Sequence, residues 1–167
     1  MTHPVLRLLK HRRLDEGDVV RLLGIGALQR AQQRVAASET GHSGEIRVCV
    51  EAGLPWSYLR RRATPRERAV AMFGKLRVWD TEHNNGVLIY LLLADRDVEI
   101  VADRGVAAKI PAAEWEAICR EMEKHLRAGS YGDAAVAGIR ATSDLLARHF
   151  PLRGPRHGEQ PDEPVVL

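Results

Sequence analysis

Residues 86–94 constrain the fold of this chain more than any other stretch. Every residue after Gly86 is apolar, over the eight positions from Val87 to Ala94. A strand of this kind is covered by helices on both faces, because neither face carries the polar side chains that suit contact with water. The run is also less than half of the ~20 residues that a membrane-spanning helix needs. The sequence therefore predicts a central strand in a sheet with helices on each side.

Two further stretches alternate between apolar and polar side chains, as half-buried strands do. Over residues 45–51, isoleucine and valine share one face, and arginine, cysteine and glutamate share the other. Residues 98–103 alternate in the same way and follow the central strand after a short turn at residues 95–97. This arrangement predicts that the second and third strands form an antiparallel hairpin.

A helix is predicted between the first two strands. Thr64, Pro65 and Glu67 supply an N-cap, a proline at the first helical position and an acidic residue three places after the cap. The apolar residues that recur at helical spacing, and would lie against the sheet, are Ala69, Val70, Phe73 and Leu76. Because this helix joins the strands at 45 and 86, we expect those strands to be parallel.

Two helices are predicted to close the domain, over residues 111–129 and 130–150. The first carries an apolar stripe made of Trp115, Ile118, Cys119, Met122 and Leu126. With the strands, they indicate an α/β fold: a three-layer α/β/α sandwich around a small mixed sheet, with a parallel βαβ unit, an antiparallel hairpin and C-terminal helices.

The chain divides into three parts on this interpretation. Residues 1–41 form an N-terminal helical segment, with an N-cap at Asp18 and an interruption at Gly24 and Gly26. Residues 42–150 form the α/β domain. Residues 151–167 contain four prolines and no periodicity, so we expect a disordered tail.

Composition excludes several function classes. Two cysteines do not make a disulfide framework, and the N-terminus carries no signal-peptide pattern, so we expect a cytoplasmic protein. Lys plus Arg exceed Asp plus Glu by 25 to 22, a small excess that argues against a nucleic-acid partner. The pair Gly24 and Gly26 neither follows a strand nor has a third glycine, and a Walker lysine is absent, so no nucleotide or organic cofactor is expected.

The loop before the central strand is a candidate metal site. It concentrates oxygen-bearing side chains at Asp80, Glu82, Asn84 and Asn85. The hairpin returns Asp103 and Arg104 to the same end of the sheet, where Asp103 would complete the ligand set and Arg104 would orient an anion. Oxygen ligands of this kind suit Ca²⁺ or another divalent cation. The alternative is an ordinary solvated turn.

A second cluster, at the opposite end of the sheet, is a candidate anion site. Arg60, Arg61 and Arg62 precede the helix that begins after Thr64. Free N–H groups at a helix N-terminus, together with arginines, attract phosphate or carboxylate. Aromatic residues Trp56 and Tyr58 would also allow single-stranded nucleic acid to stack there. The alternative is a solvated basic helix face.

Several segments in order resemble the TPM domain family, which includes thylakoid acid-phosphatase-like proteins, photosystem II repair proteins and a receptor modulator. The matching residues are Gly44-Glu45-Ile46-Arg47-Val48, Trp79, Asn85-Gly86, and Asp95-Arg96 with Val98 and Ile100. The resemblance covers about residues 36–150 and implies an α/β/α sandwich. Asn84 stands where the family motif has an aspartate, which removes a charge that a bound cation would favour.

Three interpretations of the activity remain open, of which the resemblance implies the first two and the arginine cluster the third. The leading interpretation is a protein-binding or assembly and maintenance factor with a weak divalent-metal site and another protein as its partner. The alternative is a metal-assisted acid phosphatase, in which the ion polarises a phosphoryl oxygen. The third is an anion or nucleic-acid binder that uses Arg60 to Arg62. The sequence leaves open whether the chain is an enzyme.

Overall fold

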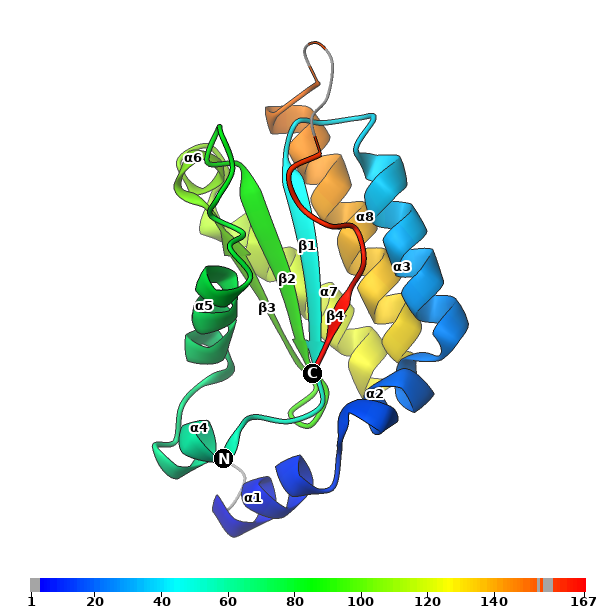
Figure 1. The fold of residues 1–167 in the computed structure, drawn as a ribbon, viewed down its shortest axis with the longest axis vertical. Helices are drawn as coiled ribbons and strands as arrows, with labels where there is room; N and C mark the ends of the chain where they lie inside the picture. The colour runs from blue at the N-terminus through cyan, green and yellow to red at the C-terminus, as the bar shows by residue number, and fades with distance from the viewer. Residues whose placement is uncertain (1–3, 153, 155–157) are drawn as a thin grey trace.

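The sheet is the centre of the computed structural model, which describes residues 4–152, 154 and 158–167. Its strands are β1 (Glu45–Glu51), β2 (Gly86–Leu92), β3 (Asp97–Ala102) and β4 (Val165–Val166). They lie in the order β3-β2-β1-β4, so β3 and β4 are the edges (Figure 1). β1 and β2 are parallel, with Val48 opposite Ile89, and β2 and β3 are antiparallel, with Ile89 opposite Ile100. Both predicted pairings are confirmed.

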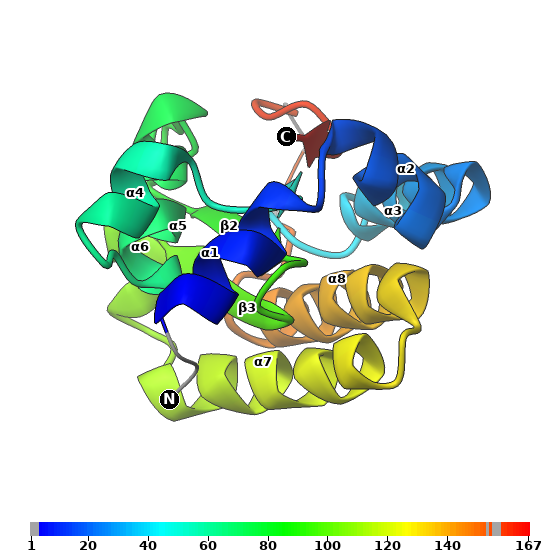
Figure 2. The same ribbon diagram turned by 90° about the horizontal axis from the view of Figure 1, so that it is seen from below.

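Helices cover both faces of this sheet. On one face lie α2 (Glu16–Leu23), α3 (Ile25–Ser38), α7 (Ala112–Arg127) and α8 (Tyr131–His149). On the other lie α4 (Trp56–Arg60) and α5 (Pro65–Lys75), while α1 (Pro4–Arg12) and the short α6 (Arg104–Ala107) lie at the two ends (Figures 1 and 2). The predicted three-layer α/β/α sandwich with a small mixed sheet is confirmed.

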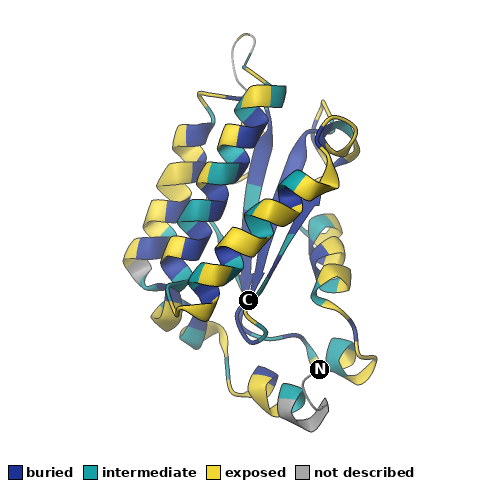
Figure 3. Ribbon diagram, turned by 180° about the vertical axis from the view of Figure 1, so that it is seen from behind, coloured by how far each residue is buried: buried dark blue, intermediate teal, exposed yellow. Residues whose placement is uncertain are grey.

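Alternate residues of each strand enter two separate cores. Val48, Val50 and Ile89 pack towards α7 and α8, whereas Cys49 and Tyr90 pack towards α5. Every residue of β2 is buried, as its uninterrupted apolar sequence predicts (Figure 3).

The capping and spacing patterns in the sequence predicted where the helices lie, but not every N-cap and buried residue. α5 begins with the predicted capping box, in which Thr64 and Glu67 bond each other's backbone N–H groups. The N-cap of α2 is Asp15 rather than the predicted Asp18, because Asp18 lies three residues after the cap and completes a second capping box with it. On α5, Val70 is exposed, although its spacing predicted contact with the sheet, and Met72 is buried instead.

The N-terminal helices share the core of the α/β domain. Val19, Leu23 and Ala27 are buried in the same cluster as Ile139 and Leu146 of α8. The boundary drawn at residues 41 and 42 therefore does not separate two cores. Residues 1–3, part of the predicted N-terminal segment, lie outside the described residues.

The C-terminal segment corrects the expectation of a disordered tail. Val165 pairs with Cys49 in a parallel bridge, and Leu167 exchanges backbone hydrogen bonds with Val50 and Ala52 at 2.9 and 2.7 Å. The proline-rich sequence removes helical and strand signals, but β1 offers an open edge that satisfies the backbone groups of this segment. Residues 153 and 155–157 lie outside the described part.

No helix within residues 4–152, 154 and 158–167 is both long and apolar enough to cross a bilayer.

Candidate functional site

The candidate metal loop is folded against itself by Thr81. The Asn84 N–H donates to the Thr81 carbonyl at 3.3 Å, and the Asn85 N–H donates to the Thr81 hydroxyl oxygen at 3.1 Å. Asn84 adopts a φ of 51°, in the left-handed region that asparagine tolerates better than most residues. The loop therefore presents Asn84 and Asn85 together at the start of β2.

The end of β3 meets this loop, as the predicted hairpin requires. The Asp103 N–H donates to the Gly86 carbonyl at 2.8 Å, and the Gly105 N–H donates to the Asn84 carbonyl at 3.0 Å. A Cβ atom at Gly105 would lie 2.6 Å from the backbone carbonyl oxygen of Asn84, so this close approach needs glycine. Arg104 is exposed and donates to the Asn84 side-chain oxygen at 3.3 Å.

Two buried oxygen atoms stand out at this junction. The Oδ1 atom of Asp103 accepts the Arg104 N–H at 2.7 Å, but its Oδ2 atom has no hydrogen-bond partner within the described residues. The Asn85 Nδ2 group donates to the Ser43 carbonyl, and the Asn85 Oδ1 atom is likewise without a partner there. Asp103 is 6% exposed and Asn85 2%. Such unpaired oxygens are uncommon in protein interiors and call for an explanation.

The other two predicted ligands lie at the surface. Asp80 and Glu82 are exposed, and the Glu82 N–H donates to the Glu159 carboxylate of the C-terminal segment at 2.9 Å. The structure thus brings the backbone of Asn84 and Gly86 against Asp103 and Gly105, with Arg104 on the Asn84 side chain, and leaves Asp80 and Glu82 at the surface. Throughout the described part of the chain, no three His, Cys, Asp or Glu side chains gather as a metal would need.

The candidate anion site is already occupied by the chain's own side chains. The Glu67 carboxylate accepts the Thr64 N–H at 2.7 Å, so an acidic group already lies at the N-terminus of α5. Arg61 stacks on the Tyr58 ring at 4.3 Å and lies 3.9 Å from the Glu67 carboxylate. Arg60 and Arg62 are exposed. An anion at this position stays a prediction, and it would compete with Glu67.

Arg68 belongs to a buried network at the carboxyl end of β1. Its guanidinium makes two hydrogen bonds to the Glu51 carboxylate, at 2.8 and 2.6 Å. The Tyr90 hydroxyl donates to the same carboxylate at 2.5 Å. Burial and the nearby Glu51 charge raise the pKa of Tyr90 well above its usual range. Burial lowers the pKa of Arg68, but its bonds to Glu51 outweigh this and raise the pKa, so the guanidinium stays charged.

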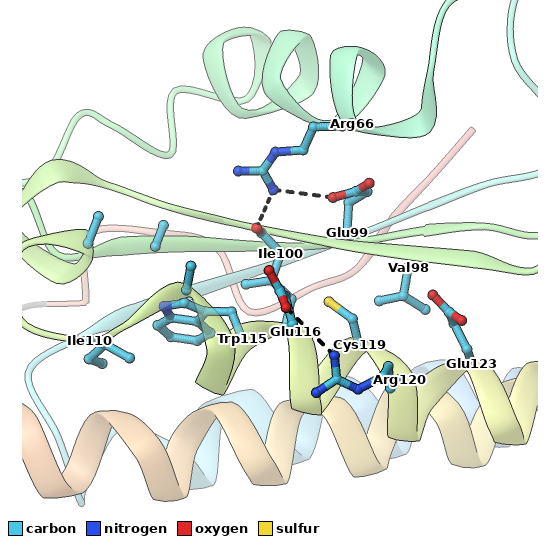
Figure 4. A pocket seen from close by; sticks show the side chains of 13 residues that line it. Arg66, Val98, Glu99, Ile100, Ile110, Trp115, Glu116, Cys119, Arg120 and Glu123 are labelled. Carbon is cyan, nitrogen blue, oxygen red and sulfur yellow. Dashed lines mark hydrogen bonds and ion pairs between the residues drawn. The ribbon is translucent and has the colours of Figure 1, made fainter.

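The sequence did not predict a groove between β3 and α7, with a volume of about 660 Å³ (Figure 4). Its walls come from residues that the helical stripe assigned to the core. Trp115, Met122 and Leu126 are buried, whereas Ile118 and Cys119 are only half-buried, and Cys119 lines the groove. One feature of the sequence could have indicated this groove. β3 is the last strand of the predicted hairpin, so one of its edges has no neighbouring strand.

Known structures share this architecture. The chain is similar to the BA42 protein of the psychrophilic bacterium Bizionia argentinensis, with 24% identity and a TM-score of 0.75. That alignment covers 86% of this chain and 94% of the other. It is also similar to the N-terminal domain of a protein from P. gingivalis, with 20% identity and a TM-score of 0.64, over 80% of this chain and 83% of the other. At these identities the likeness establishes the fold alone.

Among curated proteins, none matches the sequence. The TPM domain, by contrast, matches residues 20–145, which include α3, the three long strands and most of α8. The match begins inside α2, in agreement with the shared core of the N-terminal helices and the sheet. Because it spans well over half of the sequence, the chain belongs to the TPM domain family.

Proposed function

We propose that this chain is a binding module that holds a protein partner and takes a divalent cation, with Ca²⁺ as the best candidate, where the Asp80–Asn85 loop meets Asp103. The observation that carries the cation site is the pair of buried, unpartnered oxygens, Asp103 Oδ2 and Asn85 Oδ1. They lie on two segments joined by the bond from the Asp103 N–H to the Gly86 carbonyl. Carboxylate and amide oxygens of this kind are the ligands that a hard cation takes.

The donor set fits calcium better than a transition metal. It consists of one carboxylate, asparagine side chains and loop carbonyls, which are the oxygen ligands that Ca²⁺ accepts alongside water. Zinc and copper favour histidine or cysteine ligands, and within the described residues no cluster of these types forms. The exposed carboxylates of Asp80 and Glu82 lie on the same loop and add to the negative potential that attracts a cation.

Two features limit the affinity of this site. Asn84 supplies a neutral amide where the family motif has a carboxylate, and the Arg104 guanidinium lies 3.3 Å from the Asn84 side-chain oxygen. The positive charge of Arg104 opposes the binding of a metal cation beside it, because like charges repel strongly where water is partly excluded. We therefore expect weak binding, and we expect removal of the Arg104 charge to strengthen it.

Calorimetric titration of Ca²⁺, Mg²⁺ and Mn²⁺ into chelator-treated protein, with thermal melting in parallel, tests the cation site. We expect Ca²⁺ to bind and to raise the melting temperature of the wild type, by mass action on the folded state. Asp103→Asn should abolish both effects, and because asparagine also caps helices well, this variant should keep α6 folded. The matched control is Asp144→Asn, at an exposed position of α8.

The opposite outcomes are equally clear. If no cation changes the melting temperature, or if Asp103→Asn responds as the wild type does, the site is a solvated turn. Turnover of p-nitrophenyl phosphate that requires both the cation and Arg104 would overturn the binding role and favour the acid phosphatase that the family resemblance also implies.

A further inference from the structure

β3 presents a backbone edge to the outside of the molecule. In an antiparallel ladder, successive residues point their N–H and C=O groups alternately towards the neighbouring strand and away from it. The Asp103 N–H bonds Gly86, so Asp97, Glu99 and Val101 share that inward direction. The outward groups therefore belong to Val98, Ile100 and Ala102, and these three residues line the β3–α7 groove.

Two side chains guard the centre of this edge. The Arg66 guanidinium donates to the Ile100 carbonyl at 2.5 Å and also pairs with Glu99 at 3.3 Å (Figure 4). The Ile100 N–H in turn faces the Cys119 sulfur. Arg66 reaches over from α5, and about half of its side-chain surface is exposed, so it can move away without unfolding the helix. Such capping of an exposed edge prevents uncontrolled strand pairing.

The groove differs in character from end to end. Towards Ala102 it is apolar, with Ala107, Ile110 and Trp115 as its walls. Towards Val98 it is acidic, with Glu99 on β3 and Glu123 on α7 among the lining residues and Asp97 adjacent in sequence. Figure 4 shows Glu99 and Glu123 on opposite sides of the strand edge.

The carboxylates at the acidic end interact with one another. Burial raises the pKa of Asp97 to about 7, with further contributions from Glu99, Glu123 and Asp95, while Arg7 opposes the change. Burial, with a smaller contribution from Glu123, also raises the pKa of Glu99, while the ion pair with Arg66 opposes the change. Arg66 pairs with Glu99 and Arg127 pairs with Glu123, while Arg120, which also lines the groove, pairs with Glu116. Asp97 therefore adds one carboxylate beyond these three pairs at this end. A positive ligand group placed there would be stabilised.

From this geometry we propose that the β3–α7 groove binds an extended segment of another protein, which adds to β3 as a further strand and places a lysine or arginine beside Asp97, Glu99 and Glu123. Strand addition uses the outward backbone groups of Val98 and Ala102 and, once Arg66 moves away, the Ile100 carbonyl. Alternate side chains of the segment enter the apolar part of the groove. Six residues of strand at about 3.3 Å each span roughly 20 Å, enough for the whole length of β3.

The groove proposal names the partner class for the protein-binding role proposed above and rests on that role, but not on the cation. All binding experiments are therefore made in chelator. Loss of cation binding would leave the groove proposal intact, and failure of the peptide to bind would leave the cation site intact.

The probes are seven-residue peptides of alternating valine and threonine, acetylated, amidated and fluorescently labelled. One carries lysine at its first position and one at its last, to cover both strand directions, and matched peptides carry glutamate instead. We expect a lysine peptide to bind at least about tenfold more tightly than its glutamate counterpart, a difference that one favourable charge contact supplies. Amide shifts at Val98, Ile100 and Ala102 should accompany binding.

Three variants locate the site. Glu99→Gln with Glu123→Gln should weaken the lysine peptide about tenfold, whereas Glu121→Gln, at an exposed position on the same helix, should not. Ala102→Pro removes an outward N–H and should weaken both peptides, while the ladder to β2 remains. Arg66→Ala frees the Ile100 carbonyl and should strengthen binding. Melting curves confirm that each variant is folded.

The proposal fails if the lysine and glutamate peptides bind equally, if the glutamine variant binds as the wild type does, or if Arg66→Ala and Ala102→Pro both leave binding unchanged. It also fails if the protein self-associates through this edge, which sedimentation would show as a dimer that Ala102→Pro dissociates. In that case the occupant is a second copy of the chain.

Discussion

The Nε2 atom of His11 lies 3.1 Å from a carboxylate oxygen of Asp95, a residue 84 positions further along the chain. The other ring nitrogen, Nδ1, accepts a hydrogen bond from the Leu54 N–H at 2.9 Å. Nε2 therefore carries the ring proton and donates a hydrogen bond to Asp95. Arg7 pairs with the same carboxylate at 3.1 Å. Together these contacts hold α1 against the turn between β2 and β3.

Replacement of His11 should release α1. His11→Ala removes a fully buried ring and leaves the Leu54 N–H and one Asp95 oxygen without their partner, which costs about 1–3 kcal/mol per unsatisfied group. We expect a lower urea midpoint and early proteolytic cleavage before residue 15. Arg12→Ala, at an exposed position on the same helix, is the control. Wild-type resistance to protease in His11→Ala would show that other contacts hold α1.

The Glu51 network should be the most sensitive polar contact of the fold. Glu51 accepts from Arg68 and from Tyr90, and its side chain is only 4% exposed. Glu51→Ala leaves a guanidinium and a hydroxyl buried without a partner, so we expect a loss of about 3–5 kcal/mol in unfolding free energy. Tyr90→Phe removes one donor and keeps the ion pair, so its loss should be about 1–2 kcal/mol.

Urea denaturation measures both variants. Glu121→Ala, which removes an exposed ion pair with Lys124, serves as the control and should leave the urea midpoint unchanged. If Glu51→Ala and Tyr90→Phe cost the same, Arg68 has found another partner or water in the absence of Glu51.

Asp97 should make the protein less stable to unfolding as the pH rises, whereas an ordinary paired carboxylate makes a protein more stable. Burial, with Glu99, Glu123 and Asp95 nearby and Arg7 opposing them, raises its pKa from 3.8 to about 7 in the folded state. The folded state therefore holds this proton more tightly than the unfolded chain. The resulting stabilisation is complete below pH 3.8 and is lost as pH rises through about 7.

Asp97→Asn removes this dependence. The variant should be more stable than the wild type above pH 7, and the difference should shrink and disappear towards pH 4. Urea midpoints at several pH values, with Asp144→Asn as the exposed control, measure the effect. A constant difference between Asp97→Asn and the wild type across this range would show that Asp97 titrates normally.

Local patterns were sufficient to predict most of the fold. The alternation in residues 45–51 and the apolar run after Gly86 located two strands and their faces, because burial imposes the period directly on the sequence. The hairpin likewise predicted that Asp103 would meet the Asn84 loop. The features that the sequence did not predict depend on contacts between residues far apart in the chain. Nothing near Asp80 indicates that it faces outward, and nothing near Val165 indicates a strand.

The candidate anion site shows the same limit. Counting arginines before Thr64 predicted positive charge, and the charge is present. Its availability depends on partners that sequence spacing does not reveal: Glu67 occupies the helix N-terminus, and Arg68 pairs with Glu51 on β1. The β3–α7 groove was missed for a related reason, because a helical stripe shows which residues are apolar but not where the partner sheet ends.

The last prediction concerns the contact between Arg47 and the segment that leads into β4. The Arg47 guanidinium donates to the carbonyls of Pro161 and Glu163, the latter at 2.9 Å, and these contacts direct the chain onto the edge of β1. Arg47→Met keeps most of the side-chain stem and removes the donors. We expect β4 to open locally, with little change in global stability, because strand ends open with much lower free energy than the core.

Hydrogen exchange measures this opening at one informative amide. The Ala52 N–H bonds the Leu167 carbonyl at 2.7 Å, whereas the Leu93 N–H bonds the Glu51 carbonyl at 3.0 Å and does not involve the tail. In Arg47→Met the Ala52 amide should exchange faster by about tenfold or more, which corresponds to a loss of ~1.4 kcal/mol in the opening free energy. The Leu93 amide should exchange at the wild-type rate, as should both amides in Arg148→Met, an exposed control. If Ala52 keeps its protection in Arg47→Met, the backbone pairing of Val165 and Leu167 holds the strand without help from Arg47.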